Sequence, residues 1–228
     1  MKNLTSYGIL LALLATAFGL GCQTGPASNS ANGNTVAANH SSHDMANMKG
    51  HDMSNMNGHD MSKMDHGSSA PGAAEQPFDL QFIDSMMHHH DGAIAMAEMA
   101  LLKSEREELK TFARKIIEDQ KRENAQMKTW RESWYSGKPS ALNMELEGMK
   151  MGNMSSEHSK EMDAMQGKAF DTHFLDMMVP HHEGAVKMAR ELLKRGEHAE
   201  LKALAEQIIK EQEAEISQMQ AWKAEWNK

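Results

Sequence analysis

The chain has 228 residues and an unusual composition, with 22 methionines and 13 histidines but a single cysteine. One cysteine excludes a disulfide scaffold and any metal site built from cysteines alone. Aromatic residues make up only 5% of the chain, which argues against a β-sandwich or a β-barrel. The formal net charge of -8 argues against a protein that binds the phosphates of nucleic acid.

An apolar segment near the N-terminus predicts export. Lys2 precedes residues 4–20, which are almost all apolar or small. The strongly apolar part is shorter than the roughly 20 residues that a membrane-spanning helix requires, so residues 1–21 are predicted to be a signal peptide. The segment ends in Gly-Leu-Gly-Cys22, which resembles the lipidation motif of bacterial lipoproteins, although Gly19 stands where leucine is usual. We expect a lipid anchor on Cys22, with an ordinary cleaved signal as the alternative, and in either case an exported protein of the cell envelope, periplasmic or on the outer surface.

Residues 22–77 are predicted to be disordered, because so few large apolar side chains cannot offset the entropy lost on ordering. The frame His-Asp-Met-x-x-Met-x-Gly occurs three times within residues 43–66, with His66 replacing the last glycine. A disordered segment has no core for methionines to fill, so regular thioether and imidazole groups indicate binding of soft metal ions. Compositional drift without function is the alternative. The predicted ligands of this tail are His43, Met45, Met48, His51, Met53, Met56, His59, Met61, Met64 and His66.

A tandem duplication predicts the fold. Residues 78–134 align without a gap to residues 170–226, each residue n matching residue n + 92. Apolar residues recur at three- and four-residue steps in two segments of each copy, with a turn near Ser104 in the first and a C-capping Gly196 in the second. Two helical hairpins predict an all-α, antiparallel four-helix bundle of the ferritin-like type, with helices of roughly 25–30 residues and a pseudo-two-fold axis. The domain is expected to comprise a first hairpin (78–135), a Met-rich linker (136–169) and a second hairpin (170–228).

The linker is expected to contain one short helix. Its methionines stand in an otherwise polar stretch, after a Gly-Lys-Pro sequence that ends the preceding helix. A helix over residues 155–166 is predicted, with Ser155 or Ser156 as its N-cap. The linker methionines are Met144, Met149, Met151, Met154, Met162 and Met165.

Both copies open with the motif Phe-Asp-x-x-Phe-x-Asp-x-Met-x-x-His-His-x-Gly-Ala, at residues 78–93 and 170–185. These segments resemble the DUF305 family, in which a proline directly precedes the histidine pair. Pro180 matches that position, whereas the first copy has His88 there. The resemblance covers residues 78–228 apart from the linker. It implies a ferritin-like helical bundle and, because some members are secreted copper-binding proteins involved in copper resistance, a copper ligand.

Helix geometry places the thioether and imidazole groups of each motif on one face, since successive residues are 100° apart. Met86 lies close enough to His89 or His90 to share an ion, whereas Met96 is about 10 Å beyond His89. Thioether with imidazole favours Cu(I) and then Ag(I), and imidazoles also accept Cu(II). A structural role is the alternative: a polar network for the histidines, and core packing, which we favour, for Met96 and Met188. The predicted metal ligands of the two motifs are Met86, His89, His90, Met96, Met178, His181, His182 and Met188.

Carboxylates of the motifs are assigned other roles. Asp84 and Asp176 fall on the opposite side of their helices, where we expect them to cap a helix or to bind a neighbouring helix. Asp79 and Asp171 lie at the helix start, where an N-cap is expected.

The sequence therefore predicts an exported protein that sequesters or transfers copper or silver, and not an enzyme. Its expected partners are metal ions, a membrane through the anchor on Cys22, and a transfer protein that the sequence does not identify; nucleic acid is not expected. One alternative is a helical interaction module without metal. The other, a di-iron oxidase, requires inward carboxylates and Glu-x-x-His pairs, which the repeated helices lack, since Gln120 and Gln212 stand where a carboxylate would be needed.

Overall fold

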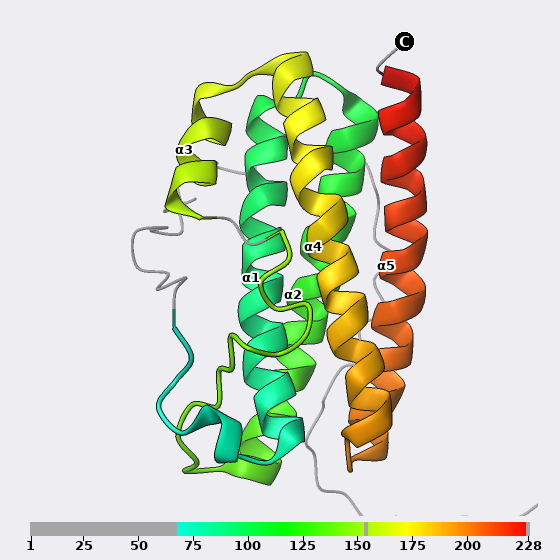
Figure 1. Cartoon of the computed structure of the whole chain (residues 1–228). Helices are drawn as coiled ribbons and strands as arrows, with labels where there is room; N and C mark the ends of the chain where they lie inside the picture. Colours follow the sequence, from blue (N-terminus) through cyan, green and yellow to red (C-terminus); the bar gives the residue numbers. More distant parts are fainter. Residues whose placement is uncertain (1–67, 153–154, 227–228) are drawn as a thin grey trace, which may run out of the picture. The chain divides into compact units, whose positions relative to one another are not determined.

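The computed structural model describes residues 68–152 and 155–226. The predicted signal peptide, Cys22 and the tail at 43–66 lie outside the described residues. The described part is helical, without strands: the 3-10 helix η3 (Ala73–Glu75) precedes α1 (Phe78–Lys103), α2 (Glu107–Tyr135), α3 (Ser156–Ala164), α4 (Gly167–Arg195) and α5 (Ala199–Trp226), as Figure 1 shows. None of the described helices is long and apolar enough to cross a membrane.

The four long helices form the predicted antiparallel bundle. Helices α1 and α2 form one hairpin, α4 and α5 the other, and α1 packs against α4 (Figure 1). The start of α1 lies at the end of α4, because the Asp79 carboxylate accepts hydrogen bonds from the backbone N–H of Glu197 and His198. Lys115 of α2 pairs with Glu215 of α5, which joins the remaining two helices. The prediction of an all-α bundle is confirmed.

A pseudo-two-fold axis relates the hairpins, as the 92-residue offset predicts. Arg131 on α2 bonds Asp84 on α1 at 2.6 Å, and Lys223 on α5 pairs with Asp176 on α4 at the equivalent place. The prediction that both aspartates bind a neighbouring helix is therefore confirmed. The same symmetry relates two stacked tryptophan pairs, Trp130 with Trp134 and Trp222 with Trp226.

Each of the two apolar clusters of the core draws on both hairpins. The first includes Ala97 and Leu109 of the first hairpin beside Phe170 and Phe174 of the second. The second includes Phe82 of the first hairpin beside Leu192 and Leu201 of the second. Because each hairpin covers the apolar stripe of the other, neither buries its core alone.

Gly196 and Asp79, which lie together at the end of α4, act differently from the prediction. Gly196 follows the last helical residue, but its φ is -65°, so it does not use the left-handed conformation of a glycine C-cap. Glycine is needed there for space, because a β-carbon would lie 2.8 Å from the Leu192 carbonyl oxygen and 3.0 Å from Asp79 Oδ1. Asp79 in turn accepts hydrogen bonds from the N–H groups of Glu197 and His198, which lie between α4 and α5. It therefore holds the turn of the other hairpin and is not the predicted N-cap of its own helix.

The linker contains the predicted short helix. Helix α3 begins after Ser155, whose hydroxyl oxygen accepts a hydrogen bond from the His158 N–H at 3.1 Å. Before it, residues 144–152, here called the strap, run across α4 (Figure 1). A β-carbon on Gly184 of α4 would overlap the Gly148 carbonyl oxygen. The strap therefore lies directly on the α4 backbone.

Candidate metal centre

The histidine pairs of the two motifs meet where α1 and α4 cross. His89, His90, His181 and His182 are all buried, with at most 1% of each residue exposed. The rings of His89 and His181 lie with their centroids 3.7 Å apart and their planes at 36°. The helix period that turns each pair inward, together with the pseudo-two-fold axis, brings the two pairs into one centre.

The second histidine of each pair is held by a carboxylate. His90 Nε2 lies 2.7 Å from Glu123 Oε2 on α2, and His182 Nε2 lies 2.9 Å from Glu215 Oε2 on α5. Such a bond fixes the orientation of an imidazole ring and strengthens it as a ligand through its other nitrogen. Neither glutamate was among the predicted site residues, although both occupy equivalent places in the two copies, at Glu123 and Glu215.

The first histidine of each pair has no such partner. Within the described residues, neither ring nitrogen of His89 and neither of His181 has a hydrogen-bond partner. A buried polar group without a partner costs about 1–3 kcal/mol, and such a group in a native fold calls for an explanation such as an ion. The Nδ1 atoms of His90 and His182 are also unpartnered. These nitrogens fit the requirement of a metal site for free imidazole donors.

Electrostatics keep the rings of His89 and His181 neutral. Burial lowers the pKa of His89 and of His181 well below the usual value, and the surrounding histidines lower both further. Neutral imidazole is the form that ligates metals. For Glu215, burial opposes ionisation, but hydrogen bonds from His182 and Lys115 outweigh it and hold the pKa below its usual value. The centre thus combines neutral donors inside with an ionised carboxylate behind them.

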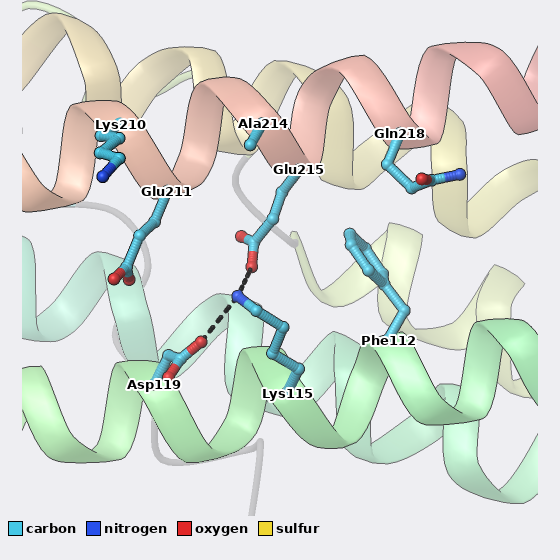
Figure 2. Close-up of a pocket in the computed structure, with 8 residues that line it drawn as sticks. All are labelled: Phe112, Lys115, Asp119, Lys210, Glu211, Ala214, Glu215 and Gln218. Carbon is cyan, nitrogen blue, oxygen red and sulfur yellow. Dashed lines mark hydrogen bonds and ion pairs between the residues drawn. The ribbon is translucent and has the colours of Figure 1, made fainter. Parts of the chain in front are cut away.

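A surface groove between α2 and α5 is lined by this carboxylate of Glu215. Figure 2 shows Lys115 between Asp119 and Glu215, with both ion pairs at 2.8 Å. The groove has a volume of about 520 Å³. Glu215 therefore bonds Lys115 in the groove and His182 in the core. In the other hairpin Gln207 takes the place of Lys115, so the two carboxylates differ in their outer partner.

The motif methionines lie in the apolar clusters. Met86 and Met188 belong to the second cluster, and Met96 and Met178 to the first, each with at most 2% exposed. Within residues 68–152 and 155–226, no three imidazole, thiol or carboxylate side chains gather as a metal site. An ion at the histidines would therefore draw on fewer donors or on a thioether. A ligand role for these four methionines stays a prediction.

The comparisons with known proteins show the family of the chain and agree with its helical fold. The family described as domain of unknown function (DUF305) matches residues 79–223. The crystal structure of a predicted secreted DUF305 protein from Streptomyces coelicolor has 28% identity and a TM-score of 0.62, covering 66% of this chain and 93% of that one. A DUF305 fragment from Deinococcus radiodurans has 27% identity and a TM-score of 0.58, covering 66% of this chain and 97% of that one.

A third relative, CopM, has been solved with metals. Its Cu(II)-bound form is 42% identical with a TM-score of 0.56, covering 65% of this chain and 97% of that one. Forms bound to Cu(I) and to Ag are 42% and 40% identical. None of the curated proteins matches the chain significantly. Because the family model spans both histidine motifs, the chain belongs to the DUF305 family.

Proposed function

We propose that this protein binds Cu(I) and Ag(I) through histidine and methionine ligands and thereby sequesters or transfers these metals outside the cytoplasm. In this proposal the bundle binds metal at the four central histidines, and the tail at 43–66 adds flexible thioether and imidazole donors. CopM, a relative with 40–42% identity, binds Cu(I), Cu(II) and Ag. That binding supports the choice of metals.

The observation that carries the proposal is the lack of partners at His89 and His181. A histidine network with a purely structural role would satisfy its buried nitrogens, as Glu123 and Glu215 do for one nitrogen each of His90 and His182. Within the part of the chain that the structure describes, the two inner rings instead have four buried nitrogens without a hydrogen-bond partner. A bound soft metal ion would offset the free-energy cost of burying these nitrogens without hydrogen-bond partners.

We also propose a binding protein rather than an enzyme, attached to a membrane through lipid on Cys22. The carboxylates nearest the centre, Glu123 and Glu215, each bond a histidine, which leaves them as orienting groups rather than as the bridging ligands of a di-iron oxidase. Export is supported by the predicted secretion of the Streptomyces coelicolor relative.

The test is a Cu(I) titration of the full chain against a coloured chelator. To remove the thioether donors of the tail, its six methionines from Met45 to Met64 are replaced by leucine, which is also apolar. We expect His89→Gln/His181→Gln to abolish the tightest binding event in this background. His173→Gln, two turns before His181 on α4, is the control and should bind as the parent does.

The outcomes separate the alternatives. If His89→Gln/His181→Gln lowers only the melting temperature and leaves stoichiometry and affinity intact, the histidines are structural and the bundle is an interaction module. If restoring the tail methionines adds no Cu(I) equivalents, the tail is not a ligand segment. Oxygen consumption with ferrous iron would contradict the binding-only proposal.

A further inference from the structure

Met151 in the strap differs in its surroundings from the strap's other methionines. Met144 and Met149 are buried, with 2% and 0% exposed, and belong to the second apolar cluster. Met151 is half-buried, and within the described residues it belongs to neither apolar cluster. Core packing, the usual role of a methionine, therefore accounts for Met144 and Met149 but not for Met151.

The side chain of Met151 starts beside the central histidines. A β-carbon on Gly184 would lie 3.1 Å from Met151 Cβ and 3.2 Å from His89 Nε2. These two atoms are therefore no more than about 6.3 Å apart, the sum of the two distances. The methionine sulfur is two bonds beyond Cβ on a flexible, unbranched chain, so the thioether can approach the imidazole nitrogen over the bare backbone of Gly184.

The equivalent place in the other half has no thioether. A β-carbon on Gly92 would lie 3.3 Å from His181 Nε2, and no other atom outside its own helix turn lies within 4 Å in the described part of the chain. Gly92 is half-buried, whereas Gly184 is buried under the strap. The strap thus makes His89 and His181 chemically different, although the bundle holds them symmetrically.

We propose that Met151 Sδ and His89 Nε2 together bind one monovalent copper or silver ion, so that the strap supplies a ligand that sets the metal preference of the centre. The proposal rests on the proposed function, because it requires the histidines to bind metal. A neutral imidazole with a thioether is a soft donor pair that favours Cu(I) and Ag(I) over Cu(II) and Zn(II). The Nε2 atom of His89 is buried and unpartnered, so it is available as the second donor.

The first test compares Met151→Leu with Met149→Leu in the full chain, again with the six tail methionines replaced by leucine. Leucine conserves volume and removes only the sulfur. We expect Met151→Leu to weaken Cu(I) and Ag(I) binding by about tenfold or more and to leave Cu(II) affinity unchanged. Met149→Leu, whose side chain lies in the apolar cluster, should change neither affinity.

A double-mutant cycle with His89→Gln tests whether the two residues share an ion. If they do, the loss caused by Met151→Leu disappears once His89 is replaced, because residues at one site are not additive. Unchanged Cu(I) affinity in Met151→Leu, with binding still lost in His89→Gln/His181→Gln, overturns this inference and leaves the proposed function intact. Full binding in His89→Gln/His181→Gln overturns both.

A second measurement avoids substitutions in the bundle. Crystals of the otherwise unaltered bundle soaked with Ag(I) should show an anomalous peak at bonding distance from both Met151 Sδ and His89 Nε2. A silver ion bound to the histidines with Met151 turned away from it would contradict the proposal even if Met151→Leu failed to fold.

Discussion

The two hairpins carry an ion pair at the same surface point with the charges exchanged. In the first, Lys121 on α2 pairs with Glu98 on α1 at 3.2 Å; in the second, Glu213 on α5 pairs with Arg190 on α4 at 2.5 Å. The buried pairs, by contrast, are the same in both hairpins, with His90 bonded to Glu123 as His182 is to Glu215. An exposed ion pair stabilises little in either polarity, so its charges can be exchanged. A carboxylate exchanged for another group at Glu123 or Glu215 would leave a buried imidazole nitrogen without its partner.

The two halves also differ in the strap, which lies on Gly184 of α4 but not on the equivalent Gly92 of α1. It is tied to α1 near its start, where the Asn143 N–H donates to Ser85 Oγ at 2.9 Å, and it then crosses α4 at Gly184. The strap, which belongs to the linker, therefore gives the two hairpins different surroundings. The comparison leads to four predictions.

Alanine substitutions at the two equivalent glycines should have the largest and most unequal effects. Gly184→Ala drives a β-carbon into the Gly148 backbone, which overpacks the site and should cost about 3 kcal/mol or more. Gly92→Ala meets only His181 Nε2 at 3.3 Å and gains helix propensity, so it should change stability by less than about 1 kcal/mol. Urea unfolding of both variants measures the difference. Equal losses would show that the strap does not press on α4.

Acid should destabilise the metal-free bundle through both inner histidines. Their pKa values are lowered in the fold by burial and by the neighbouring histidines, so the unfolded chain binds protons more tightly. Their neutral forms therefore support full stability above about pH 6.5, and stability falls as pH drops below it, by up to about 1.4 kcal/mol per pH unit for each histidine.

Denaturant unfolding at a series of pH values checks this dependence and its symmetry. His89→Gln and His181→Gln should each reduce the pH dependence of the free energy of unfolding below about pH 6.5 by the contribution of one histidine. A slope that survives in His89→Gln/His181→Gln must come from other groups, which would contradict the assignment.

Replacement of the two glutamates that orient the histidines should lower stability by unequal amounts, because only Glu215 also bonds Lys115. Glu123→Leu leaves His90 without its carboxylate, whereas Glu215→Leu removes the carboxylate of His182 and one of the two carboxylates that bond Lys115. We expect losses of about 1–3 kcal/mol for each, with Glu215→Leu the larger. Lys115→Met in the groove of Figure 2 is the control, because it should reduce the gap between the two variants. A larger loss for Glu123→Leu would be inconsistent with this account.

The surface pair should show the smallest effect. Lys121→Glu places two carboxylates together and should cost a few tenths of a kcal/mol, and adding Glu98→Lys should restore stability by recreating the polarity of the second hairpin. Thermal unfolding at low and high salt measures the stability lost in Lys121→Glu, and this loss should vanish at high salt. A persistent loss in the exchanged double variant would mean that the two surfaces are not interchangeable.

Much of the fold could be predicted from the sequence, because the patterns that determine it are local and occur in both copies. Apolar residues at helical steps predicted α1, α2, α4 and α5 close to their observed ends, and the 92-residue offset predicted their symmetric pairing. The same period turned His89 and His181 inward. Ser155 was recognisable as an N-cap, because capping involves residues only three apart.

Only the tertiary structure decided which side chains meet. Three contacts between distant segments could not be predicted: Glu123 bonds His90, Asp79 bonds the turn between α4 and α5, and the Met151 Cβ lies near His89. Periodicity assigns a residue to the face of its own helix, but it contains no information about the rotation or height of the neighbouring helix. Those two quantities are set by close packing of the whole core, and they turn a repeated histidine motif into a centre with two unequal halves.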